Sequence, residues 1–411
     1  MKKGFSIIEI ILAMAILLII VQTATVTVLN GFGANIRDEN NLQNNIANKN
    51  VLENYITTRN VGITMSGVDN IQKFSSSVGN TLFVYLSNWR KPISKRGNWA
   101  TATIIGSINL SGGNDGGETV TRDTNYFGTR LNAGPDLSTY SIGGGTTVNT
   151  VSSYSNSGKT NGIALDGNYA YLATSDNGGE FQIVNISNLS SPTASGILNI
   201  SPNAAGLDMV SDKTDRALML TGSLLYSINT SNKTSPASYG SVAVVATGRE
   251  LCVNGNYVYV TSTSDTREIQ IYSIGTSVPT SAGQLDISGN SDALSITCMG
   301  NNLAVGLADG TLMIINASNP TSLSVGSTFA SGGAINAIDH SDDNSILFLA
   351  TSNGTMEFQA IDISNLESLS RLGGVNLAGN AMGVAYNIAE DTVIIGDADN
   401  SNEYYFIKAG L

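Results

Sequence analysis

The segment Gly167-Asn168-Tyr169-Ala170-Tyr171-Leu172-Ala173, followed by Val184-Asn185-Ile186-Ser187-Asn188, sets the pattern for most of this chain. The second motif returns as Ile228-Asn229-Thr230-Ser231-Asn232, Ile315-Asn316-Ala317-Ser318-Asn319 and Ile361-Asp362-Ile363-Ser364-Asn365, with a degenerate copy at Tyr272-Ser273-Ile274-Gly275. When the copies are aligned on residues 185, 229, 273, 316 and 362, they recur about every 44 residues, which indicates an internal repeat.

Each copy of the motif follows an apolar segment typical of a buried strand. These segments are Ala170-Tyr171-Leu172-Ala173, Leu218-Met219-Leu220, Tyr257-Val258-Tyr259-Val260, Leu303-Ala304-Val305 and Leu347-Phe348-Leu349. A proline follows four of the motifs, at Pro192, Pro236, Pro279 and Pro320. A repeat of about 44 residues that holds four short strands predicts one blade of a β-propeller.

The repeat resembles the LVIVD family of bacterial surface propellers. Residues Gly167 to Ala173 and Asn185 to Leu189 carry the resemblance, which covers about residues 146–411. It implies a mainly β C-terminal domain over that range.

Five repeats run from about residue 160 to residue 379, and three further strands are predicted at Met382–Tyr386, Thr392–Gly396 and Glu403–Ile407. A fourth strand for this last sheet is expected from Thr146–Tyr154, so that both ends of the domain share one blade and leave no long open edge. We therefore expect six blades. Seven is the alternative, with residues 81–130 contributing another.

The N-terminus carries a different signal. After Lys2 and Lys3, the segment Phe5–Leu29 has Glu9 as its only ionisable residue and is long enough to span a bilayer as a helix. The two lysines orient its N-terminus toward the cytoplasm. The apolar pattern continues beyond the length of an ordinary secretory signal, which favours a retained segment.

Gly4, Phe5 and Glu9 together resemble the class III signal of type IV pilins and pseudopilins. The resemblance implies a leader at residues 1–4, cleavage by a prepilin peptidase between Gly4 and Phe5, and N-methylation of Phe5. It also implies that Glu9 pairs with the new amino group of a neighbouring subunit during filament assembly. A charge within a membrane span marks function by default, whereas the plain alternative is a single-span anchor.

The first proline of the chain is Pro92, so the helical segment lacks the proline found in many major pilins. A minor pilin or a pseudopilin fits better. Residues 30–58 continue a helical spacing, which predicts one long transmembrane and assembly helix over residues 5–58.

Residues 59–145 are expected to form a β-rich pilin-like or connecting region, with strands at Thr81–Leu86 and Ala100–Ile105. Between these strands, Trp89–Trp99 contains four basic residues. It is either a patch for an anionic partner or a solvated loop whose tryptophans cover the sheet.

Little in the sequence indicates catalysis. His340 is the only histidine, which excludes multi-histidine metal sites and most triads, and it is expected in a solvated turn. The inner strands are predicted to present a mixture of Asn161, Arg249, Glu250, Asp292 and Asn336, with no dominant acidic ring. We expect no catalytic residues and no enzyme activity.

Two further features leave alternatives open. Asp397, Asp399 and Glu403 place oxygen atoms at spacings that calcium favours, although turn chemistry also explains them. No other cofactor is expected. Cys252 and Cys298 occupy equivalent places in successive repeats, so they either pair in an oxidising compartment or stay buried as thiols.

The whole pattern predicts a minor pilin-like surface subunit in a type IV pilus-type filament, which displays a propeller for adhesion or ligand binding. Its partners would be other pilin subunits, the inner-membrane machinery and a surface glycan or protein. A net charge of −12 argues against nucleic acid as a partner. We expect the chain in the cytoplasmic membrane before assembly and at the cell surface afterwards. The alternatives are a pseudopilin of a type II secretion or DNA-uptake machine that contacts cargo, and a membrane-tethered surface hydrolase.

Overall fold

The computed structural model describes residues 63–68, 71–76, 86–87, 97–110, 115–130, 135–144, 146–155, 158–200 and 203–410. The chain divides into two compact units, Met1–Arg96 and Gly97–Leu411. Gly4, Phe5, Glu9 and the predicted helix over residues 5–58 lie outside the described residues. Within the described ranges, no helix is long and apolar enough to cross a bilayer.

In the first unit, the described residues form a small antiparallel sheet. Its strands are β1 (Ile63–Val68), β2 (Ile71–Ser76) and β3 (Leu86–Ser87), and β2 lies between the other two. The predicted strand at Thr81–Leu86 lies outside the described residues except for Leu86.

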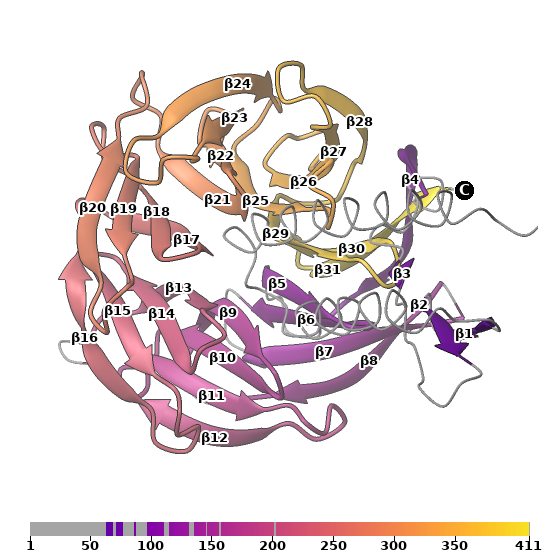
Figure 1. The fold of residues 1–411 in the computed structure, drawn as a ribbon, viewed down its shortest axis with the longest axis horizontal. Helices are drawn as coiled ribbons and strands as arrows, with labels where there is room; N and C mark the ends of the chain where they lie inside the picture. The colour runs from indigo at the N-terminus through magenta and orange to yellow at the C-terminus, as the bar shows by residue number, and fades with distance from the viewer. Residues whose placement is uncertain are drawn as a thin grey trace, which may run out of the picture. The chain divides into compact units, whose positions relative to one another are not determined.

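The second unit is a seven-bladed β-propeller, in which seven four-stranded antiparallel sheets are arranged in a ring around a central axis (Figure 1). From blade 1 to blade 7, the inner strands are β5 (Gly116–Arg122), β9 (Thr160–Asp166), β13 (Gly206–Ser211), β17 (Gly248–Asn254), β21 (Ala293–Met299), β25 (Ile335–His340) and β29 (Ala381–Asn387). The second strands are β6 (Asn125–Arg130), β10 (Tyr169–Thr174), β14 (Arg216–Thr221), β18 (Tyr257–Ser262), β22 (Asn302–Leu307), β26 (Ile346–Thr351) and β30 (Thr392–Asp397).

The third strands are β7 (Leu137–Gly143), β11 (Phe181–Asn185), β15 (Leu224–Asn229), β19 (Ile269–Ser273), β23 (Thr311–Asn316), β27 (Phe358–Asp362) and β31 (Tyr404–Gly410). The outer strands are β8 (Thr147–Tyr154), β12 (Thr193–Leu198), β16 (Ala237–Ala243), β20 (Thr280–Leu285), β24 (Ser324–Ala330), β28 (Ser370–Val375) and β4 (Asn98–Ile108).

Position in the blade explains the composition of each strand. The second strands are covered on both faces by neighbouring blades, and β10 is buried from Ala170 to Thr174. A strand buried on both faces reads as a continuous apolar run. The outer strands face solvent, and most of β12 is exposed or half-buried. The propeller predicted from the repeat is therefore confirmed.

The Asn-x-Ser-Asn motif owes its shape to two successive turns after the third strand. In the first turn, backbone amides donate to a side-chain oxygen two residues earlier, at 2.9 Å in each of four blades: Ser187 to Asn185, Ser231 to Asn229, Ser318 to Asn316 and Ser364 to Asp362. The second turn repeats this with Asn188, Asn232, Asn319 and Asn365 as acceptors. Asn and Asp favour such turns because their side chains replace a backbone acceptor.

The expected count of six blades was wrong. Residues 147–154 form β8, the outer strand of blade 1, and the strand that completes blade 7 is β4. The two ends of the domain do share a blade, but the N-terminal part comes from Asn98–Ile108. The propeller thus begins well before residue 146. The alternative count of seven is correct, but the additional blade is formed by residues 116–154 rather than 81–130, and no Asn-x-Ser-Asn motif marks it.

Both ends of β4 are fixed to blade 7. At its start, the Gly97 amide donates to Asp391 Oδ2 at 2.6 Å, and the buried Trp99 ring packs against Phe348 and Tyr386. After its end, the Leu110 amide donates to Glu403 Oε2 at 2.5 Å. Trp99 thus covers the sheet, as one interpretation of the Trp89–Trp99 segment proposed, whereas the four basic residues lie outside the described residues.

Three other blades carry the same buried glutamate before the third strand. Glu180, Glu268 and Glu357 accept from the amides of Ile200, Ile287 and Leu377, at 2.7, 2.8 and 2.7 Å. In each case the glutamate ties the start of the third strand to the chain beyond the outer strand. In blade 7 the same contact joins Glu403 to Leu110, and these two residues are 293 positions apart in the sequence.

Candidate functional site

A β-bulge near the start of every inner strand shapes the mouth of the central channel. In all seven blades, the pairing between the inner and second strand shifts by one residue at this place. Such bulges turn side chains away from the regular alternation of a strand.

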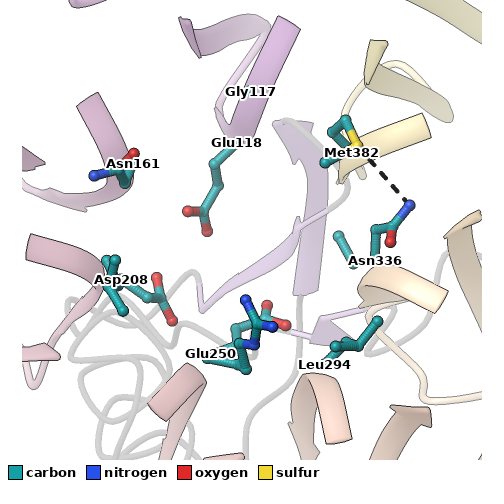
Figure 2. A pocket seen from close by; sticks show the side chains of 11 residues that line it. Gly117, Glu118, Asn161, Asp208, Glu250, Leu294, Asn336 and Met382 are labelled. Carbon is teal, nitrogen blue, oxygen red and sulfur yellow. Dashed lines mark hydrogen bonds between the residues drawn. The ribbon is translucent and has the colours of Figure 1, made fainter. Parts of the chain in front are cut away.

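The bulge residue and the residue after it line the channel. The first group consists of Gly117, Asn161, Leu207, Arg249, Leu294, Asn336 and Met382, and the second includes Glu118, Asp208, Glu250 and Ala337. Together these residues enclose a cavity of about 140 Å³ (Figure 2). All seven blades contribute to it, so the cavity exists only in the closed ring.

Three carboxylates make the cavity acidic. Figure 2 shows Glu118 of blade 1, Asp208 of blade 3 and Glu250 of blade 4 directed into the same space. Arg249 is the one cationic residue among those that line the cavity. Like charges in a confined space disfavour ionisation, as does removal from water.

Burial raises the pKa of Asp208 to about 7, although the amides of Leu251 and Met209 oppose the shift. Burial, and then the negative charge of Asp208, raise the pKa of Glu250. For Glu118, burial followed by the charges of Asp208 and Glu250 raises the pKa well above its ordinary value. The three groups therefore compete for protons.

The same side chains connect neighbouring blades. Asp208 Oδ2 accepts from the Leu251 amide at 2.8 Å, and Glu250 Oε2 accepts from the Ile296 amide at 2.9 Å. Asn161 donates to Gly206 O and Asn336 to Ala381 O, each at 2.7 Å. The polar groups of the channel thus line the cavity and hold adjacent inner strands together.

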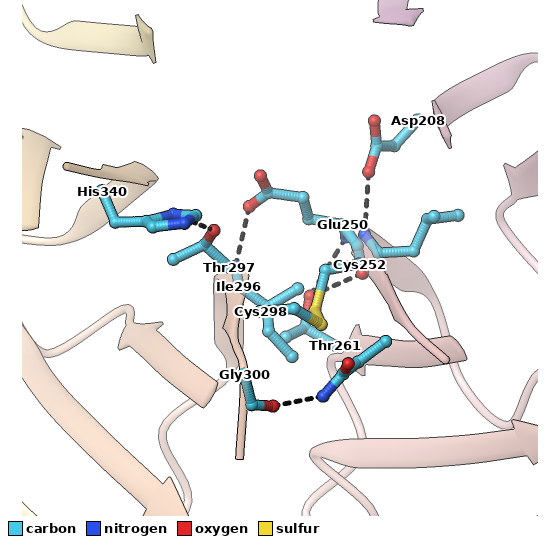
Figure 3. Close-up of a disulfide and its surroundings, with 11 residues drawn as sticks. Asp208, Glu250, Cys252, Thr261, Ile296, Thr297, Cys298, Gly300 and His340 are labelled. Atoms are coloured by element: carbon cyan, nitrogen blue, oxygen red, sulfur yellow. Dashed lines mark hydrogen bonds between the residues drawn. A yellow bond between two sulfur atoms is a disulfide. The ribbon is translucent and has the colours of Figure 1, made fainter. Parts of the chain in front are cut away.

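A disulfide joins the inner strands of blades 4 and 5 (Figure 3). Cys252 and Cys298 are bonded, with 5.7 Å between their Cα atoms, and Glu250 bridges to Ile296 beside them. Of the two alternatives left by the sequence, the structure has the bridge. No free cysteine remains.

His340 is the last residue of β25, the inner strand of blade 6, and is half-buried rather than in the solvated turn expected from the sequence. Its Nδ1 atom is 3.2 Å from Thr297 Oγ1 and 3.6 Å from Asp339 Oδ1. Burial raises the pKa of Asp339, and the electrostatic interaction with His340 opposes the shift. Asp339 Oδ2 also accepts from the Tyr386 amide at 2.7 Å, which links blades 6 and 7.

Two of the three carboxylates proposed for calcium have other contacts. Asp397 Oδ1 accepts from the Asp399 amide at 2.8 Å, which is a turn contact, and Glu403 accepts from Leu110. Burial raises the pKa of Asp397 to about 7. The described part of the chain contains no group of three or more His, Cys, Asp or Glu side chains able to hold a metal. Calcium at these residues stays a prediction.

Sequence reasoning placed four of the cavity residues correctly, namely Asn161, Arg249, Glu250 and Asn336. Asp292 does not line the cavity, and Glu118 and Asp208 were missed. The sequence feature that could have identified them is a glycine followed two residues later by an acidic residue, at the start of three inner strands. It occurs as Gly116-Gly117-Glu118, Gly206-Leu207-Asp208 and Gly248-Arg249-Glu250. Aligned on the bulge, this motif reveals the acidic mouth.

Comparison with known proteins supports the repeat and the fold. The LVIVD repeat family matches residues 157–200 and 286–330, which correspond to blades 2 and 5, so the chain contains LVIVD repeats. No curated protein matches the sequence.

Among solved structures, the WD40 repeats of RRP9 are similar, with a TM-score of 0.58 and 10% identity over 76% of this chain and 98% of that one. At this identity the similarity concerns the fold alone.

Proposed function

We propose that this chain is a minor pilin or pilin-like surface subunit, in which the helix at residues 5–58 joins a filament and the propeller binds a ligand outside the cell. The observation that carries the proposal is the order of its parts. A segment with the Gly4, Phe5 and Glu9 pattern precedes a closed propeller with a cavity at its channel mouth.

The disulfide supports export of the propeller. Cys252–Cys298 bridges two blades, and disulfides persist mainly in oxidising compartments such as the cell surface. The composition is consistent with this, because only 13% of the residues are charged and glycine is abundant.

The cavity supports ligand binding. Ligand sites are concave and combine apolar walls with a few converging polar groups. Here Leu207, Leu294 and Met382 supply apolar walls, while amide and carboxylate groups supply polarity. The ligand class proposed is a surface glycan or protein that presents polar groups to this mouth.

Removal of the Glu9 charge tests the assembly half of the proposal. Glu9→Ala should be exported and cleaved but should enter sheared filaments poorly, because the carboxylate no longer sets the register against the Phe5 amine. Glu39→Ala, outside the apolar segment, is the matched control and should assemble normally. Equal incorporation of the two variants, measured by immunoblotting of sheared filaments, would refute the assembly role.

A cavity-filling substitution tests the binding half. Met382→Trp should fill the channel mouth and abolish retention on a glycan array or a cell-surface protein array that retains the wild-type chain. Val278→Trp changes an exposed residue of the β19–β20 loop and should bind as the wild type does. Undiminished binding by the Met382 variant would exclude the channel mouth as the site.

A further inference from the structure

We propose that the channel mouth is controlled by protons: Glu118, Asp208 and Glu250 share protons within one confined cavity, so that the cavity is less negatively charged in acid and more negatively charged in alkali. This inference rests on the proposed function only for its biological use, because the exchange of protons is a property of the propeller itself.

The geometry keeps the carboxylates close together. Asp208 and Glu250 are held by the amides of Leu251 and Ile296, which belong to the next blade in each case. Glu118 reaches toward them from blade 1 (Figure 2). Two of the three groups therefore cannot turn toward bulk solvent without losing a contact between blades.

The strands that line the mouth supply little compensating positive charge. Strand β17 supplies Arg249, and β25 carries His340 and Asp339, whose charge raises the pKa of Glu250. At the mouth itself, β9, β21 and β29 contribute only the uncharged Asn161, Leu294 and Met382. One arginine faces three carboxylates, so full ionisation leaves an excess of negative charge.

The pKa directions agree with the geometry. The pKa of Asp208 rises to about 7, and those of Glu118 and Glu250 rise as well, with burial as the largest cause for each group. A native pKa above the unfolded value means that the folded state holds the proton longer. For Asp208, stability from this source is complete below the unfolded pKa of about 4 and is lost as the pH rises through about 7.

The consequence for the site is a charge that depends on the surroundings. At neutral to alkaline pH the mouth attracts cationic groups, and at acid pH it presents neutral carboxyl groups that can donate hydrogen bonds. The carboxylates that change charge are also those that join blades 3, 4 and 5, so ligand affinity and the stiffness of these joints would change together.

The test compares the full-length chain in detergent with Glu118→Gln, which removes one ionisable group without removing any hydrogen bond described for the carboxylate. Glu367→Gln, at an exposed loop position, is the matched control. Thermal unfolding and proton release are measured from about pH 5 to about pH 8. The wild type should lose stability as the pH rises, and Glu118→Gln should lose less and release fewer protons.

Infrared spectroscopy of the wild type gives a second readout that does not depend on a variant. A protonated carboxyl band should be present near neutral pH, and it should be weaker in Glu118→Gln or Asp208→Asn. Identical pH profiles for Glu118→Gln and Glu367→Gln, or no protonated carboxyl in the wild type, would overturn the proposal. Neither filament nor ligand is present, so failure here is distinct from failure of the proposed function.

Discussion

At the scale of single residues, Lys233 joins blades 2 and 3 through contacts with Tyr171 and Asp166. Its Nζ atom lies 2.7 Å from Tyr171 Oη and 3.1 Å from Asp166 Oδ2, and Tyr171 itself is fully buried. Although burial opposes ionisation of Asp166, hydrogen bonds from Tyr171 and Lys233 lower its pKa overall. The aspartate therefore stabilises the fold above its unfolded pKa, and this contribution is lost as the pH falls through the native value.

Lys233→Met should destabilise the propeller by roughly 1–2 kcal/mol, less than loss of a fully buried partner because the lysine keeps some solvent contact. Lys159→Met should have little effect, because the Lys159 side chain makes no hydrogen bond or ion pair within the described part of the chain. Urea unfolding of both variants provides the measurement. Equal stability of the two would show that the network contributes nothing measurable.

At the scale of elements, the strand that closes the ring depends on side chains at both of its ends. Glu403 and Glu268 make the same contact, but only Glu403 holds a strand that is remote in sequence. Either glutamate replaced by Ala leaves a buried amide without its acceptor, at a cost of about 1–3 kcal/mol.

Glu403→Ala should in addition release the end of β4. Amide hydrogen exchange should accelerate over residues 98–110 in this variant, whereas Glu268→Ala should affect only blade 4. Unchanged protection of β4 would contradict the role given to Glu403.

The disulfide acts on two neighbouring inner strands. It joins cysteines 46 residues apart, so its reduction should cost about 2–4 kcal/mol through the greater freedom of the unfolded chain. The thermal midpoint should therefore fall on reduction. Cys252→Ala/Cys298→Ala is the matched variant, and reductant should leave its midpoint unchanged.

Much of the blade structure could be predicted because it depends on local patterns. Runs such as Tyr257–Val260 and turn residues such as Asn185 are visible within one repeat. Blade 1 and the acidic mouth could not be found in this way. To find either one, the repeats must be aligned on the β-bulge of the inner strand, and the residues at this bulge, such as Gly117 and Leu207, share no chemical character. The partner of β31 was also missed, because nothing local connects Ile108 to Tyr404.

At the scale of the whole molecule, ring closure requires the chain from Gly97 onward. A chain that begins at Gly97 should fold as a monomer, since this unit is compact by itself. A chain that begins after Leu110 should aggregate or pair through the exposed edge of β31, because a free edge strand invites pairing. Light scattering after gel filtration measures the molar mass of each of the two chains. A stable monomer from the shorter chain would show that β4 is dispensable.

The central claim is that a processed, pilin-like N-terminus carries this propeller outside the cell. Mass spectrometry of the N-terminal peptide from sheared surface filaments tests it most directly. We predict a peptide that begins at methylated Phe5. Recovery of the chain with Met1 to Gly4 intact, as a monomer in the membrane or in the cytosol, would contradict the claim.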